Sequence, residues 1–119
     1  CYIYDSFNGS TLSNLLASEL NGSFAEAGYH SVALSSPLKV TAGNDVYAVV
    51  KFTNSSDTYP IAADDQGPYE TGTTYISSNG SSGSWYDLGA NQSNDVAIRL
   101  RGITQPSLTI TSPNGGENW

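Results

Sequence analysis

The chain has 119 residues, enough for one domain around one hydrophobic core. Only 13% of the residues are charged, about half the share of an ordinary domain, and Ser, Thr, Asn and Gly take their place. The net charge is −7, and the four cations, Lys39, Lys51, Arg99 and Arg101, are scattered. We therefore expect no nucleic-acid partner and no attraction to anionic membranes, because both need clustered positive charge. A surface of hydroxyls and amides is typical of secreted modules and predicts an extracellular or cell-surface location.

The single cysteine, Cys1, leaves no partner for an intramolecular disulfide. No segment approaches the roughly 20 apolar residues of a membrane-spanning helix, so no membrane span is expected. Because position 1 is not an initiator methionine, we expect the chain to have been processed or trimmed. Cys1 could carry a lipid anchor, but a strand-like segment follows it at once where anchored proteins have a flexible linker. The preferred interpretations are a buried thiol or simply the first residue of a piece of a longer chain.

Taken in chain order, the expected elements are mostly strands. Residues 1–4 are β-rich, residues 10–17 fit a short helical turn with three leucines on one face, and residues 29–34 alternate. Residues 45–52 form a β-branched and aromatic run, which predicts a central strand buried on both faces. Residues 73–77 and 84–88 flank Asn79-Gly80, a hairpin signal. Residues 95–101 alternate, with Val96, Ile98 and Leu100 directed inward.

Turn residues separate these segments at 7–9, 42–45, 53–57 and 89–92. The spacing of strands and turns predicts an all-β fold, an antiparallel jelly-roll-like β-sandwich. Gln105-Pro106 indicates a domain boundary, so we expect one domain over residues 1–104. Residues 105–119 would then be a linker and the first strand of a following domain, or a donor strand for another chain.

The sequence resembles the lectin-like β-sandwich domain of secreted archaeal and bacterial proteins, which often lies beside papain-like cysteine peptidases. The resemblance is carried by many short matches in order over residues 1–102. They are Tyr2-Ile-Tyr-Asp5, Phe7-Asn-Gly, Leu12-Ser-Asn-Leu-Leu-Ala17, Ala27-Gly-Tyr-His30, Leu38, Thr41-Ala-Gly-Asn-Asp45, Tyr47, Val49-Val-Lys-Phe52, Tyr59-Pro-Ile61, Tyr75-Ile-Ser-Ser78, Trp85 and Asp95-Val-Ala-Ile-Arg99. The segment from Leu108 to Trp119, with its Ser-Pro-Asn-Gly-Gly-Glu run, is similar to the opening of a secreted immunoglobulin-like repeat.

The resemblance implies one or more strands before the strand that begins at Cys1. On that basis the sandwich would be incomplete and complemented by a strand from another chain, through β-strand addition. It also implies a non-catalytic accessory module, because the peptidase motifs of the neighbouring domains are not among these residues. A nucleophile and base pair of Cys1 and His30 is the enzymatic alternative, but no oxyanion-hole or elbow motif surrounds either residue.

Aromatic and carboxylate residues are interleaved in the second half of the chain. This combination suits a sugar site, because a sugar ring stacks on an aromatic face and its hydroxyls donate hydrogen bonds to carboxylates. We expect Tyr75 and Trp85 to pack in the core instead. The predicted ligand-binding residues are Tyr59, Asp64, Asp65, Tyr69 and Glu70.

The same loops carry hard oxygen ligands that suit Ca²⁺, and Asp57, Asp64 and Asp65 are the predicted metal ligands. No EF-hand spacing is present, so solvated loop carboxylates are the competing interpretation.

Five sequons for N-glycosylation fall at predicted turns, and in an extracellular chain we expect several to carry glycans. They are Asn8, Asn21, Asn54, Asn79 and Asn91. A polar composition produces some sequons by chance, which is the alternative.

Two functions from different classes remain. The first is an extracellular adhesion or carbohydrate-binding accessory module that recognises glycans or a cell-surface polymer. The second is a structural subunit of a filament or surface layer, in which neighbouring copies join by strand exchange.

Overall fold

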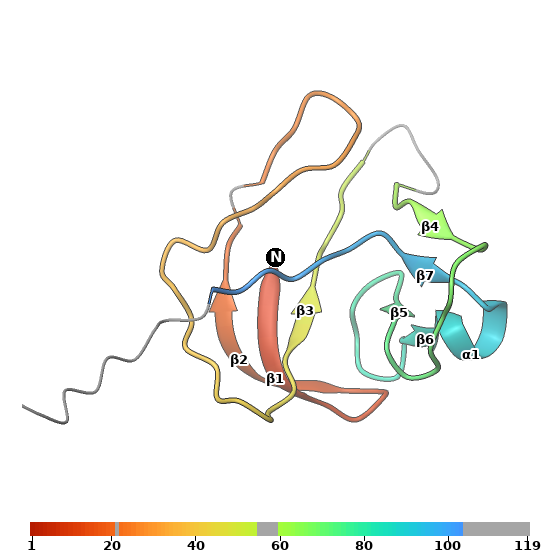
Figure 1. The fold of residues 1–119 in the computed structure, drawn as a ribbon, viewed down its shortest axis with the longest axis horizontal. Helices are drawn as coiled ribbons and strands as arrows, with labels where there is room; N and C mark the ends of the chain where they lie inside the picture. Colours follow the sequence, from red (N-terminus) through yellow and green to blue (C-terminus); the bar gives the residue numbers. More distant parts are fainter. Residues whose placement is uncertain (21, 55–59, 104–119) are drawn as a thin grey trace, which may run out of the picture.

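The computed structural model describes residues 1–20, 22–54 and 60–103. Within these residues the chain forms three small antiparallel sheets and one short helix (Figure 1). The prediction of an all-β antiparallel fold is confirmed. The described residues contain no helix with the length and apolar character that a membrane crossing requires.

The largest sheet has the strand order β2-β1-β3, with β1 (Tyr2–Phe7) between β2 (Leu12–Ser18) and β3 (Tyr47–Val49). Both neighbours run antiparallel to β1. Ile3, on the central strand, is only 1% exposed. Asn8 reverses the chain between β1 and β2, because its Oδ1 accepts the backbone N–H groups of Ser10 and Thr11 at 3.0 and 2.7 Å.

The helical turn predicted over residues 10–17 is wrong, because these residues form β2. The Asn8 turn folds them back on β1, whose backbone groups pair with theirs from Phe7 with Leu12 to Tyr2 with Ser18. The helical spacing of the leucines does not build a buried face, since Leu15 is 51% and Leu16 37% exposed. Pairing with β1 therefore outweighs the local pattern.

Residues 45–52 form a shorter and less buried strand than predicted. Only Tyr47–Val49 are paired, and the order of the sheet makes β1 the central strand and β3 an edge. Residues 46–50 are half-buried, whereas Phe52 is exposed. The strand predicted over residues 29–34 is also absent, and that segment is irregular and largely exposed.

Two short strand pairs form the remaining sheets. The prediction of a hairpin around Asn79-Gly80 is confirmed, because β5 (Tyr75–Ile76) pairs antiparallel with β6 (Tyr86–Asp87). Within its loop, Ser77 Oγ accepts the N–H groups of Asn79 and Gly80 at 3.3 and 2.8 Å.

The other pair joins β4 (Ala63–Asp64) to β7 (Asp95–Val96). The N–H of Ala97 extends the pair by donating to Ala62 O at 2.9 Å. The N–H of Ile98 then donates to the carbonyl of Val96 at 2.8 Å and bends the chain. The strand predicted over residues 95–101 therefore ends early. Val96 and Ile98 are half-buried as expected, but Leu100 is exposed.

The turn predicted at residues 89–92 is instead part of the helix α1 (Leu88–Gln92). Asp87 is its N-cap, and the Asp87 carboxylate accepts the N–H of Ala90 at 2.9 Å. Leu88 is 4% exposed, and Gly89 is buried against the backbone of Glu70. The helix thus holds the loop before β5 against the end of β6.

An aromatic cluster connects the large sheet to the β5–β6 hairpin. Phe7 packs edge to face on Tyr47, Tyr75 and Trp85, with ring centroids 5.8, 4.8 and 5.8 Å away. Edge-to-face pairs at these distances are favourable beyond the area that they bury. The prediction that Tyr75 and Trp85 pack internally is confirmed, and each does so through Phe7.

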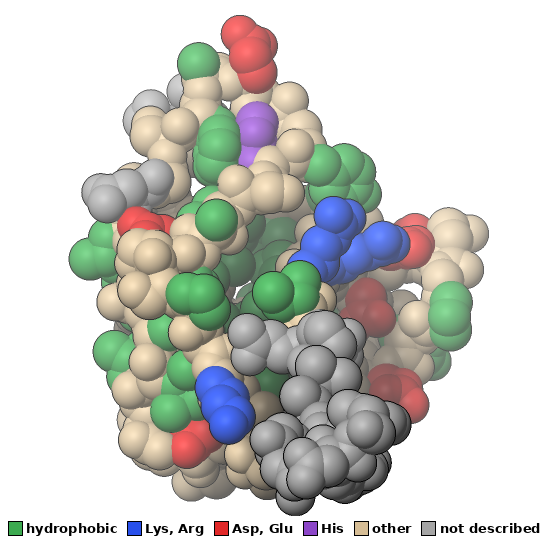
Figure 2. Space-filling view, turned by 60° about the vertical axis from the view of Figure 1, so that its left-hand side comes forward, with side chains coloured by type: hydrophobic (Ala, Val, Ile, Leu, Met, Phe, Trp, Pro, Cys, Tyr) green, Lys and Arg blue, Asp and Glu red, His purple; other side chains and the backbone are tan. Residues whose placement is uncertain are grey.

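The four rings of this cluster are half-buried, and few side chains elsewhere in the described residues are fully enclosed. Among the described hydrophobic residues, Ile3 and Leu88 are the buried ones. On the face shown in Figure 2, hydrophobic side chains lie in separate groups among polar ones, and the basic side chains occupy separate places.

Candidate functional site

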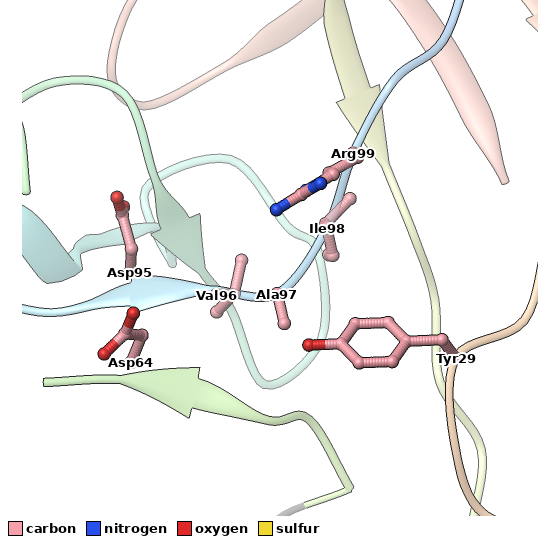
Figure 3. A pocket seen from close by; sticks show the side chains of 7 residues that line it. All are labelled: Tyr29, Asp64, Asp95, Val96, Ala97, Ile98 and Arg99. Atoms are coloured by element: carbon pink, nitrogen blue, oxygen red, sulfur yellow. The ribbon is translucent and has the colours of Figure 1, made fainter. Parts of the chain in front are cut away.

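A shallow pocket of about 240 Å³ lies beside the β4–β7 pair (Figure 3). It is open to solvent, and its walls come from three separate parts of the chain. Its lining residues are Tyr29, Asp64, Asp95, Val96, Ala97, Ile98 and Arg99.

Strand pairing places two acidic residues opposite each other at one end of the pocket. Asp64 on β4 lies directly opposite Asp95 on β7. In Figure 3 the side chain of Asp64 is directed toward β7, whereas the side chain of Asp95 is directed away from β4.

Each carboxylate accepts hydrogen bonds through one of its two oxygens, Asp64 from two donors and Asp95 from one. Asp64 Oδ1 accepts the N–H groups of Gln66 and Gly67 at 2.9 and 3.2 Å. Asp95 Oδ1 accepts the Thr74 hydroxyl at 2.5 Å. The second oxygen of each remains available as an acceptor in the described structure. The side chains are therefore oriented while keeping capacity for a ligand.

The other end of the pocket is formed by an aromatic ring and a cation. Tyr29 is 90% exposed, and its hydroxyl is directed toward Ala97 (Figure 3). Arg99, beyond the end of β7, also lines the pocket, and in Figure 3 its side chain lies across the segment 95–99 from Tyr29 and Asp64. The lining therefore contains an aromatic ring, carboxylate acceptors and a guanidinium donor, the kinds of group found in sites for small polar ligands.

Of the predicted ligand residues, Asp64 lines this pocket. Asp65, Tyr69 and Glu70 lie on the exposed loop that follows β4 and do not line it. Tyr59 and Asp57 lie outside the described residues. Sequence reasoning missed Tyr29 and Arg99, which were assigned to strands. Asp95, which was also assigned to a strand, was missed as well.

Asp57 lies outside the described residues, and the other two predicted Ca²⁺ ligands, Asp64 and Asp65, lie in the part of the chain that the structure describes. There, no group of three or more His, Cys, Asp or Glu side chains could hold a metal ion. Asp65 Oδ1 instead accepts a hydrogen bond from Gln66 Nε2 at 2.9 Å.

Cys1 and His30, the nucleophile and base of the enzymatic alternative, contact other residues. His30 stacks on Phe24 at a centroid distance of 4.0 Å, and its Nε2 bonds to Glu26 O at 2.7 Å. The N-terminal amine of Cys1 donates to Glu19 O at 2.8 Å, extending the β1–β2 pair. Neither His30 nor Cys1 lines the pocket.

Four of the five sequon asparagines, Asn8, Asn54, Asn79 and Asn91, fall in the described residues and are exposed. Asn21 lies outside them.

A second hollow of about 150 Å³ is lined partly by Asp5, Lys39 and Asp45.

The fold and the pocket define an all-β module with a shallow site suited to a small polar ligand. Residues 1–104 match the model of the lectin-like domain family. The chain therefore belongs to that family. No curated protein and no solved structure matches it.

Proposed function

We propose that this chain is a non-catalytic, extracellular carbohydrate-binding module and that its sugar site is the pocket beside β4 and β7. The observation that carries the proposal is that the exposed Tyr29 and the two acidic residues Asp64 and Asp95, which are partners in the β4–β7 register, line one pocket. Membership of the lectin-like family supports the same ligand class.

The chemistry of the pocket matches that of a sugar ring. The C–H groups on one face of a pyranose stack on an aromatic ring, and its hydroxyls donate to carboxylate oxygens. The Arg99 guanidinium can donate to a ring or hydroxyl oxygen. The volume of about 240 Å³ is below the usual range for drug-sized ligands, so the site has room for one ring or one chain end.

The charge of the pocket narrows the class of sugar. Two carboxylates and one guanidinium leave it net negative, within a chain of net charge −7. Neutral sugars and amino sugars are therefore favoured over uronic and sialic acids, which would add like charge. Affinity for a single ring is expected to be weak because the pocket is open, and a multivalent surface would strengthen binding by avidity.

A glycan array that includes neutral, amino and acidic sugars tests the proposal, followed by titration of the best ligand into two variants. Tyr29→Ala should weaken binding at least tenfold. Tyr69→Ala is the matched control because Tyr69 is also exposed, at 47%, but lies outside the pocket. Unchanged binding in Tyr29→Ala, or recognition of acidic sugars alone, would contradict the proposal.

The non-catalytic part of the proposal has its own test. The oligosaccharide that binds best is incubated with the protein, and released reducing ends are measured over time. We expect reducing ends to be released no faster with the parent chain than with the Asp64→Asn variant. Release that depends on Asp64 or Asp95 would make the chain a glycosidase with paired carboxylates.

Assembly by strand exchange is a second candidate function, favoured by the position of β2. This strand is an edge of the sheet in the described structure and exposes Leu15 and Leu16. An exposed edge can template pairing with another strand. Light scattering should then show oligomers that Leu16→Lys or deletion of residues 105–119 disrupts, and a monodisperse monomer would refute this function.

A further inference from the structure

Three of the five sequon asparagines, Asn8, Asn79 and Asn91, fall into two classes according to the hydrogen bonds that their side-chain amides make. All three asparagines are exposed. They differ in which end of the amide the fold uses. This difference decides whether the nitrogen that would carry a glycan is available in the folded chain.

Asn8 and Asn79 use their oxygens. Asn8 Oδ1 accepts the N–H groups of Ser10 and Thr11, and Asn79 Oδ1 accepts the N–H of Ser81 at 2.9 Å. A backbone N–H can only donate, so these bonds fix the oxygen on the turn. Because the amide is planar, Nδ2 then lies on the other branch and faces away from those donors. In the described part of the chain, neither Nδ2 donates to another residue.

Asn91 uses its nitrogen. It lies in α1, and its Nδ2 donates to the carbonyl of Asp87 one helical turn earlier at 2.7 Å. The third residue of this sequon, Ser93, is the C-cap of the helix in a left-handed conformation with φ 55°. Modifying Asn91 would require the nitrogen to leave that carbonyl and the end of the helix to open.

The two available sequons also lie side by side. The N–H of Gly83 donates to Ser10 O at 3.0 Å, and the hydroxyls of Thr11 and Ser82 are hydrogen-bonded. These contacts join the β1–β2 turn to the β5–β6 loop (Figure 1). Neither turn contributes to the pocket beside β4 and β7.

We propose that Asn8 and Asn79 are N-glycan acceptors of the folded chain, that Asn91 is not one, and that the glycans on Asn8 and Asn79 cluster at the joined turns and leave the pocket open. The donor class is a lipid-phosphate-linked oligosaccharide. Asn Nδ2 forms a bond to C1 of the donor sugar, and the bond from C1 to the phosphate oxygen breaks. The lipid phosphate leaves with the bonding electron pair, and the amide gives one proton to a base of the transferase.

The test uses the purified, unglycosylated chain, a single-subunit oligosaccharyltransferase and its lipid-linked donor. Peptide mass mapping measures the transfer rate at each site, and each rate is divided by that of a synthetic peptide covering the same sequon. We expect ratios near one at Asn8 and Asn79 and a ratio at least fivefold lower at Asn91.

Three variants serve as controls. Ser10→Ala and Ser81→Ala remove one sequon each while keeping the backbone N–H that holds the asparagine oxygen. Asp87→Ala removes the N-cap of α1, so the Asn91 ratio should rise.

Equal ratios at all three sites, or a low ratio at Asn8 or Asn79, would overturn the proposal. Because the assay measures transfer and not sugar recognition, its failure is distinct from a failure of the carbohydrate-binding proposal. A second measurement tests where the glycans lie. The chain glycosylated at both Asn8 and Asn79 should bind the array ligand as tightly as the unmodified chain, and a large loss of binding would contradict the placement of the glycans.

Discussion

The substitution Gly89→Ala tests how tightly α1 is packed on the loop before β5. A Cβ at this position would lie 2.3 Å from the carbonyl oxygen of Glu70, 2.7 Å from its carbonyl carbon and 3.1 Å from the nitrogen of Thr71. These atoms are backbone and cannot rotate away. The first distance is more than 1 Å short of the roughly 3.5 Å of a favourable contact, so the helix and the loop must separate.

Two effects of the substitution oppose each other. Overpacking of this kind costs up to about 3 kcal/mol. Alanine in place of glycine within a helix recovers about 1 kcal/mol. The steric cost is larger, so the free energy of unfolding should fall by about 2 kcal/mol. For a domain of this size that lowers Tm by roughly 8 °C.

Thermal unfolding followed by far-UV circular dichroism measures this change. Gly102→Ala is the matched control, because nothing lies within 4 Å of a Cβ there. Its stability should stay within about 0.5 kcal/mol of the parent chain. If Gly89→Ala melts at the same temperature as Gly102→Ala, or higher, the contact between α1 and the Glu70 backbone is not as described.

Three further substitutions probe the cluster, the helix cap and the pocket. Phe7→Ala removes three edge-to-face contacts and should cost about 3 kcal/mol in urea unfolding, whereas a loss below about 1 kcal/mol would show that the cluster does not join the sheets. Asp87→Ala removes an N-cap and should cost about 1 kcal/mol, while Asp87→Asn, which keeps an acceptor, should cost less; equal losses would count against capping. Gly67→Ala places a Cβ 2.8 Å from Asp64 Oδ2, so the carboxylate must move. Sugar binding should weaken about fivefold at nearly unchanged Tm, and unchanged affinity would argue against a role for Asp64.

The parts of the fold that follow from local chemistry could be predicted from the sequence. Asn8-Gly9 and Asn79-Gly80 combine a side-chain acceptor with residues that tolerate positive φ, and both form turns. The β runs on either side of the second turn pair as a hairpin. The class of fold, all-β and antiparallel, followed from these signals.

The parts that depend on which segments pair with which could not be predicted in this way. The leucines of residues 12–16 have helical spacing, yet β1 supplies a backbone ladder that the spacing does not encode. Residues 45–52 have the composition of a central strand, but the pairing order places β3 at an edge.

The same limitation applies to the pocket. Asp64 and Asp95 are 31 positions apart by their numbers and meet only because β4 pairs with β7 in one register. Tyr29 comes from an irregular loop whose alternation predicted a strand. Predicting ligand residues by proximity in sequence therefore favoured the loop of Asp65, Tyr69 and Glu70 over residues that are close only in space.

The most direct test of the central claim is an NMR titration of the ¹⁵N-labelled chain with neutral and amino monosaccharides at millimolar concentrations. Binding in the pocket predicts that the amide signals of Val96, Ala97 and Ile98 shift with saturation, while those of β2 stay in place. Tyr29→Ala should abolish these shifts without changing the rest of the spectrum. Saturable shifts confined to residues outside the pocket, or no shifts with any of these sugars, would contradict the account.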